Sequence, residues 1–410
     1  MSVATDTSER VWVALEELLE QHPPAATDAQ TFWAAQYDAG LAWVDFPVGF
    51  GGLGIETQAQ EPVDERLASS GAPRPEVRNL VGVQMMAPTL VRFGTPEQCA
   101  RHLRPTFTCS EIWCQLFSEP GAGSDLAAIS TRAVRDGDDW IVNGQKVWTT
   151  LAHLADRAIL LARTDPSVPK HAGLSFFLVD MRAPGVDVRP LRQITGEAEY
   201  NEVFLTDVRI PDRDRVGDPG RGWKIAMSTL TSERGVVSDL TRGPAMTGLV
   251  ERLLAAWRDA DDSRRTAAHR DAVVRSWVEA MVARWNGERA EASRQAGRAG
   301  VEGSLSKNAF GALSQQVLDL CIGLHGPEGL LVDHYAPVQP EVFSHTGGAQ
   351  DDDAVLAKAF LGARALTIAG GTTEVNKNVV SERILGLPAE PRPDRDAPWH
   401  ATSSAAGGTE

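Results

Sequence analysis

The chain has 410 residues, which at roughly 150 residues per domain is enough for two or three domains with a sizeable core. It carries 40 Lys and Arg residues against 55 Asp and Glu residues, and the resulting charge of −15 repels nucleic-acid phosphates and anionic lipid alike. No apolar run approaches the ~18 residues that a membrane-spanning helix needs. We therefore expect neither a nucleic acid nor a membrane among the partners of this protein.

The cysteines, histidines and N-terminus show no sign of secretion or of metal binding. None of the four cysteines lies in a CxxC pair, so we expect reduced, packed thiols. The nine histidines form neither an HExxH motif nor a cluster, and we expect no metal site. The first residues lack the basic region and apolar core of a secretory signal, so a cytoplasmic location is the default expectation.

The first quarter of the chain has a helical pattern. Apolar residues recur three and four positions apart in VWVALEELLEQ, and this pattern extends from Ser8 to about Arg104. It is interrupted by the loop PVGFGGLG, Pro47 to Gly54, whose glycines permit backbone angles that other residues resist. We assign residues 1–110 to an N-terminal helical domain.

The next segment is rich in short β-type runs. They are IWCQLF, DWIVNG, QKVWTT, RAILLAR, LSFFLVD and EVFL, and Gly, Asp and Asn residues separate them. Asp136-Gly137 and Asn143-Gly144 are dipeptides typical of two-residue hairpin turns. The pattern predicts a middle β domain at residues 111–215.

The helical period returns from Arg221 onward. It is clear in WKIAMSTLTSERGVVSDL, AVVRSWVEAMVARW and NAFGALSQQVLDLCIGL, segments long enough for a four-helix bundle. We assign this bundle to residues 216–388. Residues 389–410 are rich in Pro, Ser and Gly and are predicted to be a disordered tail. The predicted fold class is therefore a multidomain α+β protein.

Three segments carry residues suited to ligand binding. SEPGAGSD, Ser118 to Asp125, follows an apolar strand and exposes amides and hydroxyls, although a Gly/Ser loop taken alone is more often a plain turn. KVWTT places the Trp148 indole beside two hydroxyls, although alone the indole indicates a core aromatic residue. In IAGGTTEVNKNVVSERILGLP, a Gly-Gly-Thr-Thr turn leads into a helix whose N-terminal amides either hold a ligand or are simply capped.

Taken in this order on a helix, strand, helix plan, these segments resemble the acyl-CoA dehydrogenase family from Trp12 to Pro388. PVGFGGLG, IWCQLFSEPGAGSDLA, NGQKVWTT and GRGWKIAMSTLTSERG are each similar to a family motif. The resemblance implies an N-terminal helical domain, a central β-barrel-like domain and a C-terminal four-helix bundle. The segment ending at Pro388 looks most like the actinobacterial branch that acts on bulky or steroid-type acyl-CoA thioesters.

The family resemblance also implies a cofactor, a reaction and partners. FAD would take the β-hydrogen of an acyl-CoA as hydride while a carboxylate removes the α-proton, giving a 2-enoyl-CoA. Electrons would then pass to an electron-transferring flavoprotein, and an acyl carrier protein thioester is an alternative substrate. The implied FAD contacts are Gln115, Phe117, Ser118, Trp148, Thr149, Thr150, Gly326, Thr372 and Glu374.

The sequence departs from the family at the catalytic base. Most members carry a Glu in a Tyr-Glu-Gly-Thr sequence, where this chain reads Ala369-Gly370-Gly371-Thr372. A minority carries the base in a Glu-Arg pair on the first helix of the bundle, and Glu233-Arg234 stands at the matching place. Glu233 is our candidate base, with a structural surface pair as the alternative.

Other candidate substrate contacts follow from the same resemblance. The Gly370 N–H would donate to the thioester carbonyl, and Ser124 would touch the pantetheine arm, while Thr231 and Arg234 complete the expected substrate contacts. Small residues in place of Tyr-Glu predict a wide pocket for branched or ring-bearing acyl groups.

A second departure concerns assembly. Family members offer an Arg…Phe-Gly motif and a Gln before Gly-Gly-x-Gly to the FAD of a neighbouring subunit, but DDSRRTAAHRDAVVRSW has no Phe-Gly, and Gly323 to Gly329 follows no Gln. A homo-oligomer with different contacts and a heterotetramer with a related chain both remain open. Two other functions are kept as alternatives: a non-catalytic half-site subunit, and a flavin monooxygenase on the same scaffold.

Overall fold

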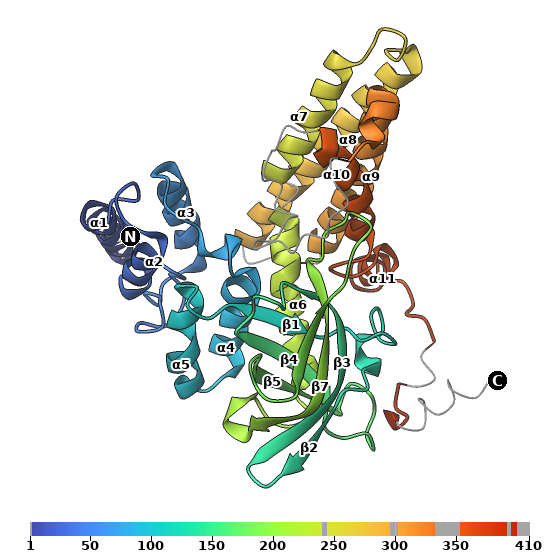
Figure 1. The fold of residues 1–410 in the computed structure, drawn as a ribbon. Coiled ribbons are helices and arrows are strands. Elements are labelled where there is room, and N and C mark those ends of the chain that lie inside the picture. The colour runs from blue at the N-terminus through green and yellow to red at the C-terminus, as the bar shows by residue number, and fades with distance from the viewer. Residues whose placement is uncertain are drawn as a thin grey trace, which may run out of the picture.

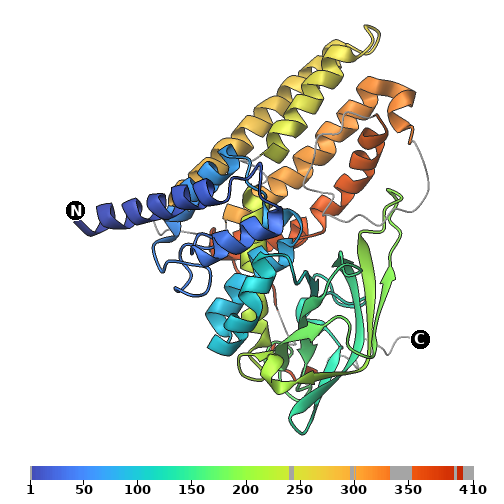
Figure 2. The same ribbon diagram turned by 60° about the vertical axis from the view of Figure 1, so that its left-hand side comes forward.

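The computed structural model describes residues 2–239, 244–295, 300, 302–332, 353–391 and 395–399. Figure 1 and Figure 2 show N-terminal helices beside a sheet, with a long helical bundle rising from their junction. The N-terminal helices are α1 (Ser2–Gln21), α2 (Ala29–Asp38), α3 (Gln60–Ser69), α4 (Ala87–Phe93) and α5 (Pro96–Phe107). The strands are β1 (Trp113–Leu116), β2 (Arg132–Asp136), β3 (Asp139–Thr150), β4 (Arg157–Arg163), β5 (Leu174–Asp180), β6 (Val186–Pro190), β7 (Tyr200–Pro211) and β8 (Arg215–Val216). The later helices are α6 (Gly222–Asp239), α7 (Pro244–Asp259), α8 (Ala267–Gln295), α9 (Glu302–His325), α10 (Asp353–Gly362) and α11 (Thr373–Arg383).

Local signals set the ends of the N-terminal helices. Thr95 and Gln98 form a reciprocal capping box at the start of α5, which satisfies two backbone N–H groups that the helix leaves unpaired. In the PVGFGGLG loop, Gly51 has a φ of +85°, and a Cβ atom at Gly52 would lie 2.1 Å from the carbonyl oxygen of Phe46. Only glycine fits this close approach of two backbone segments.

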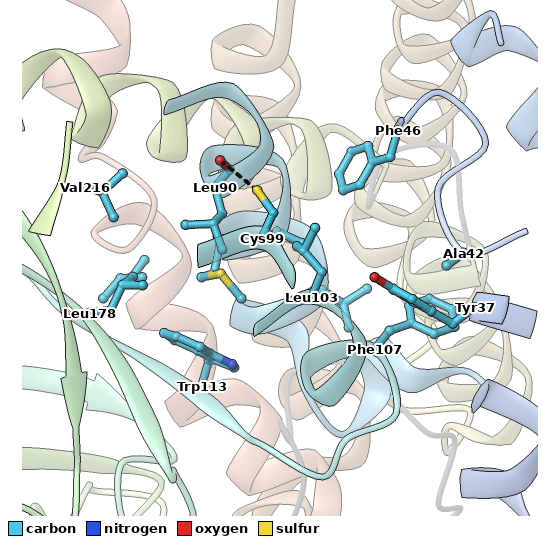
Figure 3. Close-up of a cluster of buried hydrophobic side chains, with 14 of the residues drawn as sticks. Tyr37, Ala42, Phe46, Leu90, Cys99, Leu103, Phe107, Trp113, Leu178 and Val216 are labelled. Carbon is cyan, nitrogen blue, oxygen red and sulfur yellow. Dashed lines mark hydrogen bonds between the residues drawn. The ribbon is translucent and has the colours of Figure 1, made fainter. Parts of the chain in front are cut away.

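The N-terminal helices and the sheet share one hydrophobic core. Figure 3 shows Leu103 and Phe107 of α5 in the same cluster as Trp113 of β1 and Leu178 of β5, and all four side chains are buried. The thiol of Cys99 donates to the carbonyl oxygen of Leu90 in the same cluster, at 3.5 Å. All four cysteines are free thiols, as expected from their spacing. Burial of this shared surface fixes the first helices against the middle domain.

The eight strands form one sheet in the order β6-β7-β3-β2-β4-β5-β8, and β1 pairs in parallel with β4. The predicted hairpin at Asp136-Gly137 is confirmed, since Asp136 pairs with Asp139 across the β2–β3 turn. Rings from the two halves of the sheet meet inside it: Trp140 of β3 lies 5.5 Å from Phe177 of β5. Both rings belong to a buried cluster whose members all come from the middle domain, so the sheet has a hydrophobic core of its own.

The predicted hairpin at Asn143-Gly144 is wrong. β3 passes through both residues as one strand, and its register with β7 shifts between Val142 and Gly144. The side-chain amide of Asn143 donates to Asp207 Oδ1 at 2.9 Å and accepts the Asp207 backbone N–H at 3.0 Å. These two bonds link the irregular part of β3 to the neighbouring strand β7. The Asn-Gly dipeptide here marks a bulge in a long strand rather than its end.

The four long helices α6 to α9 confirm the predicted bundle. None of the segments quoted from the sequence corresponds to α7. The shorter helices α10 and α11 pack against α9. α6 also packs against β4, β5 and α4. At its buried face the hydroxyl of Thr229 lies 2.9 Å from that of Thr89 in α4. α6 thus joins all three parts of the molecule. Within the described ranges, no helix is both long and apolar enough to cross a membrane.

Part of the segment expected to be a disordered tail is ordered against the middle domain. Pro398 forms a β-bridge with Pro169, and the Trp399 N–H donates to the carbonyl oxygen of Val168 at 3.0 Å. Figure 1 shows the chain, in red, leaving α11 and descending from the bundle. Composition predicted disorder because an average over the segment does not detect a contact made by one aromatic residue, Trp399.

Candidate functional site

The loop after β1 is bound tightly to β3. The ammonium group of Lys146 donates to the carbonyl oxygens of Phe117 and Leu161, each at 2.9 Å. One residue further along β3, the N–H of Val147 donates to the carbonyl oxygen of Ser118 at 2.9 Å. The structure therefore brings the predicted contacts Phe117 and Ser118 alongside the strand that carries Trp148.

A buried ion pair organises this junction. Lys146 also donates to Glu119 Oε1 at 2.8 Å, and Glu119 accepts the backbone N–H groups of Ser130 and Thr131. Burial opposes the charged carboxylate, but Lys146 and these donors outweigh burial and lower the pKa of Glu119. Burial in turn lowers the pKa of Lys146 to about 8. The sequence alone assigns no role to Glu119. Its only signal there is that Glu119 and Lys146 each stand in a segment suited to ligand binding.

The end of β3 has a strained backbone and an open indole. Trp148 has a φ of +61° and Leu151 a φ of +51°, an unfavourable region for residues with a Cβ atom. The Trp148 side chain is 61% exposed and contacts only the edge of Tyr200 among the aromatic rings of the described residues. Thr149 between them is 1% exposed, and its Oγ1 has no hydrogen-bond partner within the described part of the chain.

The turn before α11 presents the second group of predicted residues. Gly370 and Gly371 have φ values of +66° and +87°, and Thr372 caps α11 by accepting the Val375 N–H at 3.2 Å. The N-terminal amides of α11 are therefore directed outward at this turn. Glu374, in the first turn of α11, is exposed. Figure 1 and Figure 2 place α11 at the junction of the bundle and the sheet.

A buried lysine supports this turn from α9. Lys307 is 3% exposed, and its ammonium nitrogen lies 2.5 Å from the carbonyl oxygen of Gly371. The Asn376 amide donates to the same oxygen at 2.9 Å. Burial lowers the pKa of Lys307, and the negative charge of Glu374 partly opposes this. Two donors thus fix the backbone beside Gly370, a role that the sequence did not indicate.

Of the predicted substrate contacts, Ser124 is exposed in the loop 118–125. In the same loop, a Cβ atom added to Gly121 or Gly123 would meet no other atom within 4 Å. The packing of the chain itself therefore does not require glycine at those two positions. Thr231 is exposed on α6, and its hydroxyl donates to the Met227 carbonyl oxygen at 2.8 Å. Glu233 and Arg234 lie in α6, but their side chains are outside the described residues.

Gly326 is not brought near the other candidates. Lys307 and His325 are 18 residues apart in α9, so at about 1.5 Å per residue the turns at Gly371 and Gly326 lie about 27 Å apart along the helix. At the far end, Arg264 lies against Gly326, where a Cβ atom would clash with its guanidinium, and Nη1 lies 3.5 Å from the Leu324 carbonyl oxygen. One chain therefore carries two separate groups of candidate cofactor residues.

The first group fits a heteroaromatic ligand. It combines the exposed Trp148 indole, the unpartnered buried hydroxyl of Thr149 and the amides at the start of α11. Gln115 and Thr150 are half-buried on β1 and β3. Among the described residues, no group of three His, Cys, Asp or Glu side chains is arranged to hold a metal ion. The indole, hydroxyl and helix amides of the first group suit stacking and hydrogen bonding.

Three family models match nearly the whole chain. The acyl-CoA dehydrogenase N-terminal domain matches residues 8–109, the middle domain residues 114–208 and the C-terminal domain residues 220–385. Acyl-CoA dehydrogenase IpdE1 of Mycobacterium tuberculosis is 39% identical over 364 residues, 86% of each chain. Acyl-CoA dehydrogenase FadE34 of the same organism is 39% identical over 89% of this chain and 47% of its own.

Solved structures agree with these matches. The Tcur3481-Tcur3483 steroid ACAD superposes with a TM-score of 0.71 at 24% identity, covering 95% of this chain and 99% of that chain, which shows the fold alone. The ChsE4-ChsE5 complex from Mycobacterium tuberculosis superposes with a TM-score of 0.68 at 25% identity, covering 95% of this chain and 98% of that chain. With its helical, β and helical parts each matched in order, the chain belongs to the acyl-CoA dehydrogenase family.

Proposed function

We propose that this acyl-CoA dehydrogenase uses FAD to oxidise a bulky or branched acyl-CoA to the 2-enoyl-CoA. The observation that carries the cofactor assignment is the end of β3, where two consecutive residues offer an exposed indole, at Trp148, and a buried hydroxyl without a partner among the described residues, at Thr149. Bound FAD would supply a hydride acceptor for the β-hydrogen. Trp148, Thr149 and Thr150 would hold the flavin from the middle domain, and Thr372 and Glu374 from α11.

The chain supplies the remaining groups. The Gly370 N–H donates to the thioester carbonyl oxygen and makes the α-proton more acidic, because negative charge develops on that oxygen as the proton leaves. Lys307 and Asn376 hold the adjacent Gly371 carbonyl and so orient this N–H before substrate binds. Ser124, on the exposed loop 118–125, contacts the pantetheine arm.

Glu233 is the proposed proton acceptor, because no carboxylate is present at Ala369 to Thr372. It follows the buried residue Thr229 of α6 by four residues, about one helical turn. The neighbouring Arg234 is the further proposed substrate contact on this helix.

The small residues Ala369 and Gly370 leave room beside the flavin, which favours branched or ring-bearing acyl groups. The structural similarity to a protein described as a steroid ACAD supports this class. A panel of straight, branched and ring-bearing acyl-CoA substrates tests it, and a preference for short straight chains would contradict it.

We further propose that the protein works as an oligomer, in which Gly326 and Arg264 reach the FAD of a neighbouring chain. The distance between the two ends of α9 supports this division. α8 also exposes an apolar stripe at intervals of three and four residues, formed by Val274, Trp277, Val278, Val282 and Trp285. The similarity to the ChsE4-ChsE5 complex favours a heterotetramer with a related chain over a homo-oligomer.

The second candidate is a half-site subunit that completes a partner's active site without catalysing the reaction itself. The missing carboxylate at Ala369 to Thr372 favours it. In that case Glu233 is dispensable, whereas Arg264 and Gly326 are required.

An electron-transferring flavoprotein remains the proposed electron acceptor for the dehydrogenase.

Anaerobic mixing with ring-bearing and branched acyl-CoA tests the proposal by the loss of flavin absorbance. We expect bleaching by the wild type, and loss of both bleaching and α-proton exchange in Glu233→Gln with FAD still bound. Glu251→Gln, an exposed change on α7, is the matched control. Retained turnover in Glu233→Gln would exclude Glu233 as the base, and bleaching only after a related chain is added would indicate the half-site role.

A further inference from the structure

The ordered part of the C-terminal segment covers one buried arginine. The Cζ atom of Arg163 lies 4.3 Å from the centre of the Trp399 ring, within the range of a cation–π contact. Arg163 is 3% exposed, and no carboxylate of the described residues forms an ion pair with it. Burial lowers its pKa to about 10. The charges of Glu119 and Asp125 partly oppose this effect, and the Trp399 indole adds a direct contact to the buried guanidinium.

The same guanidinium holds the loop that carries Ser124. Arg163 Nη2 donates to the carbonyl oxygen of Ala127 at 2.6 Å, and Nε donates to that of Ile129 at 3.1 Å. Both acceptors lie just after SEPGAGSD. Without Arg163 these two carbonyl groups, which belong to buried residues, would lose their donors.

The β4–β5 connection makes a second link to this loop. Arg163 Nη1 donates to the Lys170 carbonyl oxygen at 3.2 Å, and the Lys170 ammonium group bonds Asp125 at 2.8 Å. The tail contacts the same connection through the Pro398–Pro169 bridge and the Trp399 N–H. A continuous set of contacts thus runs from the tail to residues 125–129.

We propose that Pro398 and Trp399 form a strap that fixes the loop 121–129 and thereby raises the affinity for the CoA part of the substrate. This inference rests on the proposed function through Ser124, the loop residue expected to contact the pantetheine arm. The family match ends at residue 385, so the strap lies outside the part of the chain that the family models cover. Trp399 and Arg163 are positioning residues, since they act through the loop and not on the reacting atoms.

The test uses flavin-loaded full-length protein and free CoA as the probe. Trp399→Ala removes the ring over Arg163, and Trp399→Phe retains an aromatic face. A chain lacking residues 401–410 retains the strap and is the first control. Trp12→Ala is the second, because it removes another partly exposed indole, on α1. Calorimetric titration then gives the Kd for CoA, and steady-state kinetics give KM and kcat separately.

We expect Trp399→Ala to weaken CoA binding roughly 2- to 30-fold, the range that one cation–π contact spans. KM should rise by a similar factor while kcat and the FAD content stay within twofold of the wild type. Trp399→Phe should recover most of the affinity, and both controls should match the wild type. Arg163→Lys should cause at least the same loss, since it also removes hydrogen bonds to the loop. The double variant should be no worse than Arg163→Lys alone, because the Trp399 ring acts on the loop through the Arg163 guanidinium.

Amide hydrogen exchange provides a readout that needs no turnover. Residues 121–129 should exchange faster in Trp399→Ala and in Arg163→Lys than in either control. Unchanged exchange together with unchanged CoA affinity would overturn the strap, as would an equal loss of FAD and kcat at constant KM. If the wild type oxidises no thioester, the proposed function fails, but exchange at residues 121–129 still decides whether the strap holds the loop.

Discussion

The ammonium nitrogen of Lys146 lies 2.8 Å from Glu119 Oε1, and the two side chains are 0% and 5% exposed. This pair joins the loop after β1 to the strand that carries Trp148. Two charges buried together are compensated only by each other and by their hydrogen bonds, so removal of one leaves the other without compensation. The pair is therefore a structural requirement for the predicted flavin-facing surface.

Lys146→Met should lower the free energy of unfolding by about 3–5 kcal/mol, because Glu119 would stay buried without its cation. Urea denaturation followed by far-ultraviolet circular dichroism measures this loss. Arg104→Met breaks an exposed pair with Asp38 and should cost at most about 1 kcal/mol. An equal effect of the two substitutions would show that the buried pair has no special role.

Acid should weaken the same junction. The pKa of Glu119 is lowered from 4.5 in the folded protein, so its stabilising contribution is complete above pH 4.5 and is lost as pH falls through the lower folded pKa. Below pH 4.5 the free energy of unfolding of the wild type should therefore fall with a steeper slope than that of Glu119→Gln. Chemical denaturation at a series of pH values compares the slopes, and parallel curves would contradict the assignment.

Lys307→Met should loosen the Gly370–Gly371 turn. Loss of a buried charged donor costs about 1–3 kcal/mol of stability, and kcat should fall while FAD content is retained, since the Gly370 N–H is no longer held. Lys307→Gln keeps a donor and should recover part of kcat. Normal kcat in Lys307→Met would show that the turn is set by Asn376 alone.

The apolar stripe on α8 should be an assembly surface. Trp285 is 62% exposed and Trp277 is 44% exposed, and large side chains exposed on one face of a helix are typical of interfaces. Trp285→Glu should reduce the sedimentation-derived mass toward that of a single chain. Arg284→Glu, an exposed change one residue away, should not. An unchanged mass for Trp285→Glu would place the interface elsewhere.

The sequence predicted those parts of the fold that depend on local pattern. The helical period located α1, α6, α8 and α9, because burial of one face imposes this period. The short β-type runs located β1, β3, β4, β5 and β7, whereas no predicted run covers β2, β6 or β8. The hairpin predicted at Asn143-Gly144 was wrong, because the same dipeptide that ends a strand in a hairpin also permits a bulge within a continuous strand. Here Asn143 bonds Asp207 on β7, a strand that neighbours β3 in the sheet but is distant in the sequence.

The site was predictable only as far as its motifs extend. Trp148, Thr149 and Thr372 were found because they stand in contiguous segments with a recognisable order. Lys307 and Arg163 were missed, since each acts on a segment far away in the sequence, and no local pattern distinguishes them from other cations. Contacts of this kind are a property of the folded chain.

The length of α9 determines whether two inactive variants of this protein can complement each other. Its first turns support Gly371 and its last turn leads to Gly326, about 27 Å away, so each proposed flavin site takes one end of this helix from each of two chains. A variant inactivated at Lys307 still has an intact Gly326 end, and one inactivated at Arg264 still has an intact Gly371 end. In a homo-oligomer, two inactive variants co-expressed in one cell would restore activity at the interfaces where their intact ends meet. In a heterotetramer the related chain supplies the second end, and the two variants would not complement each other.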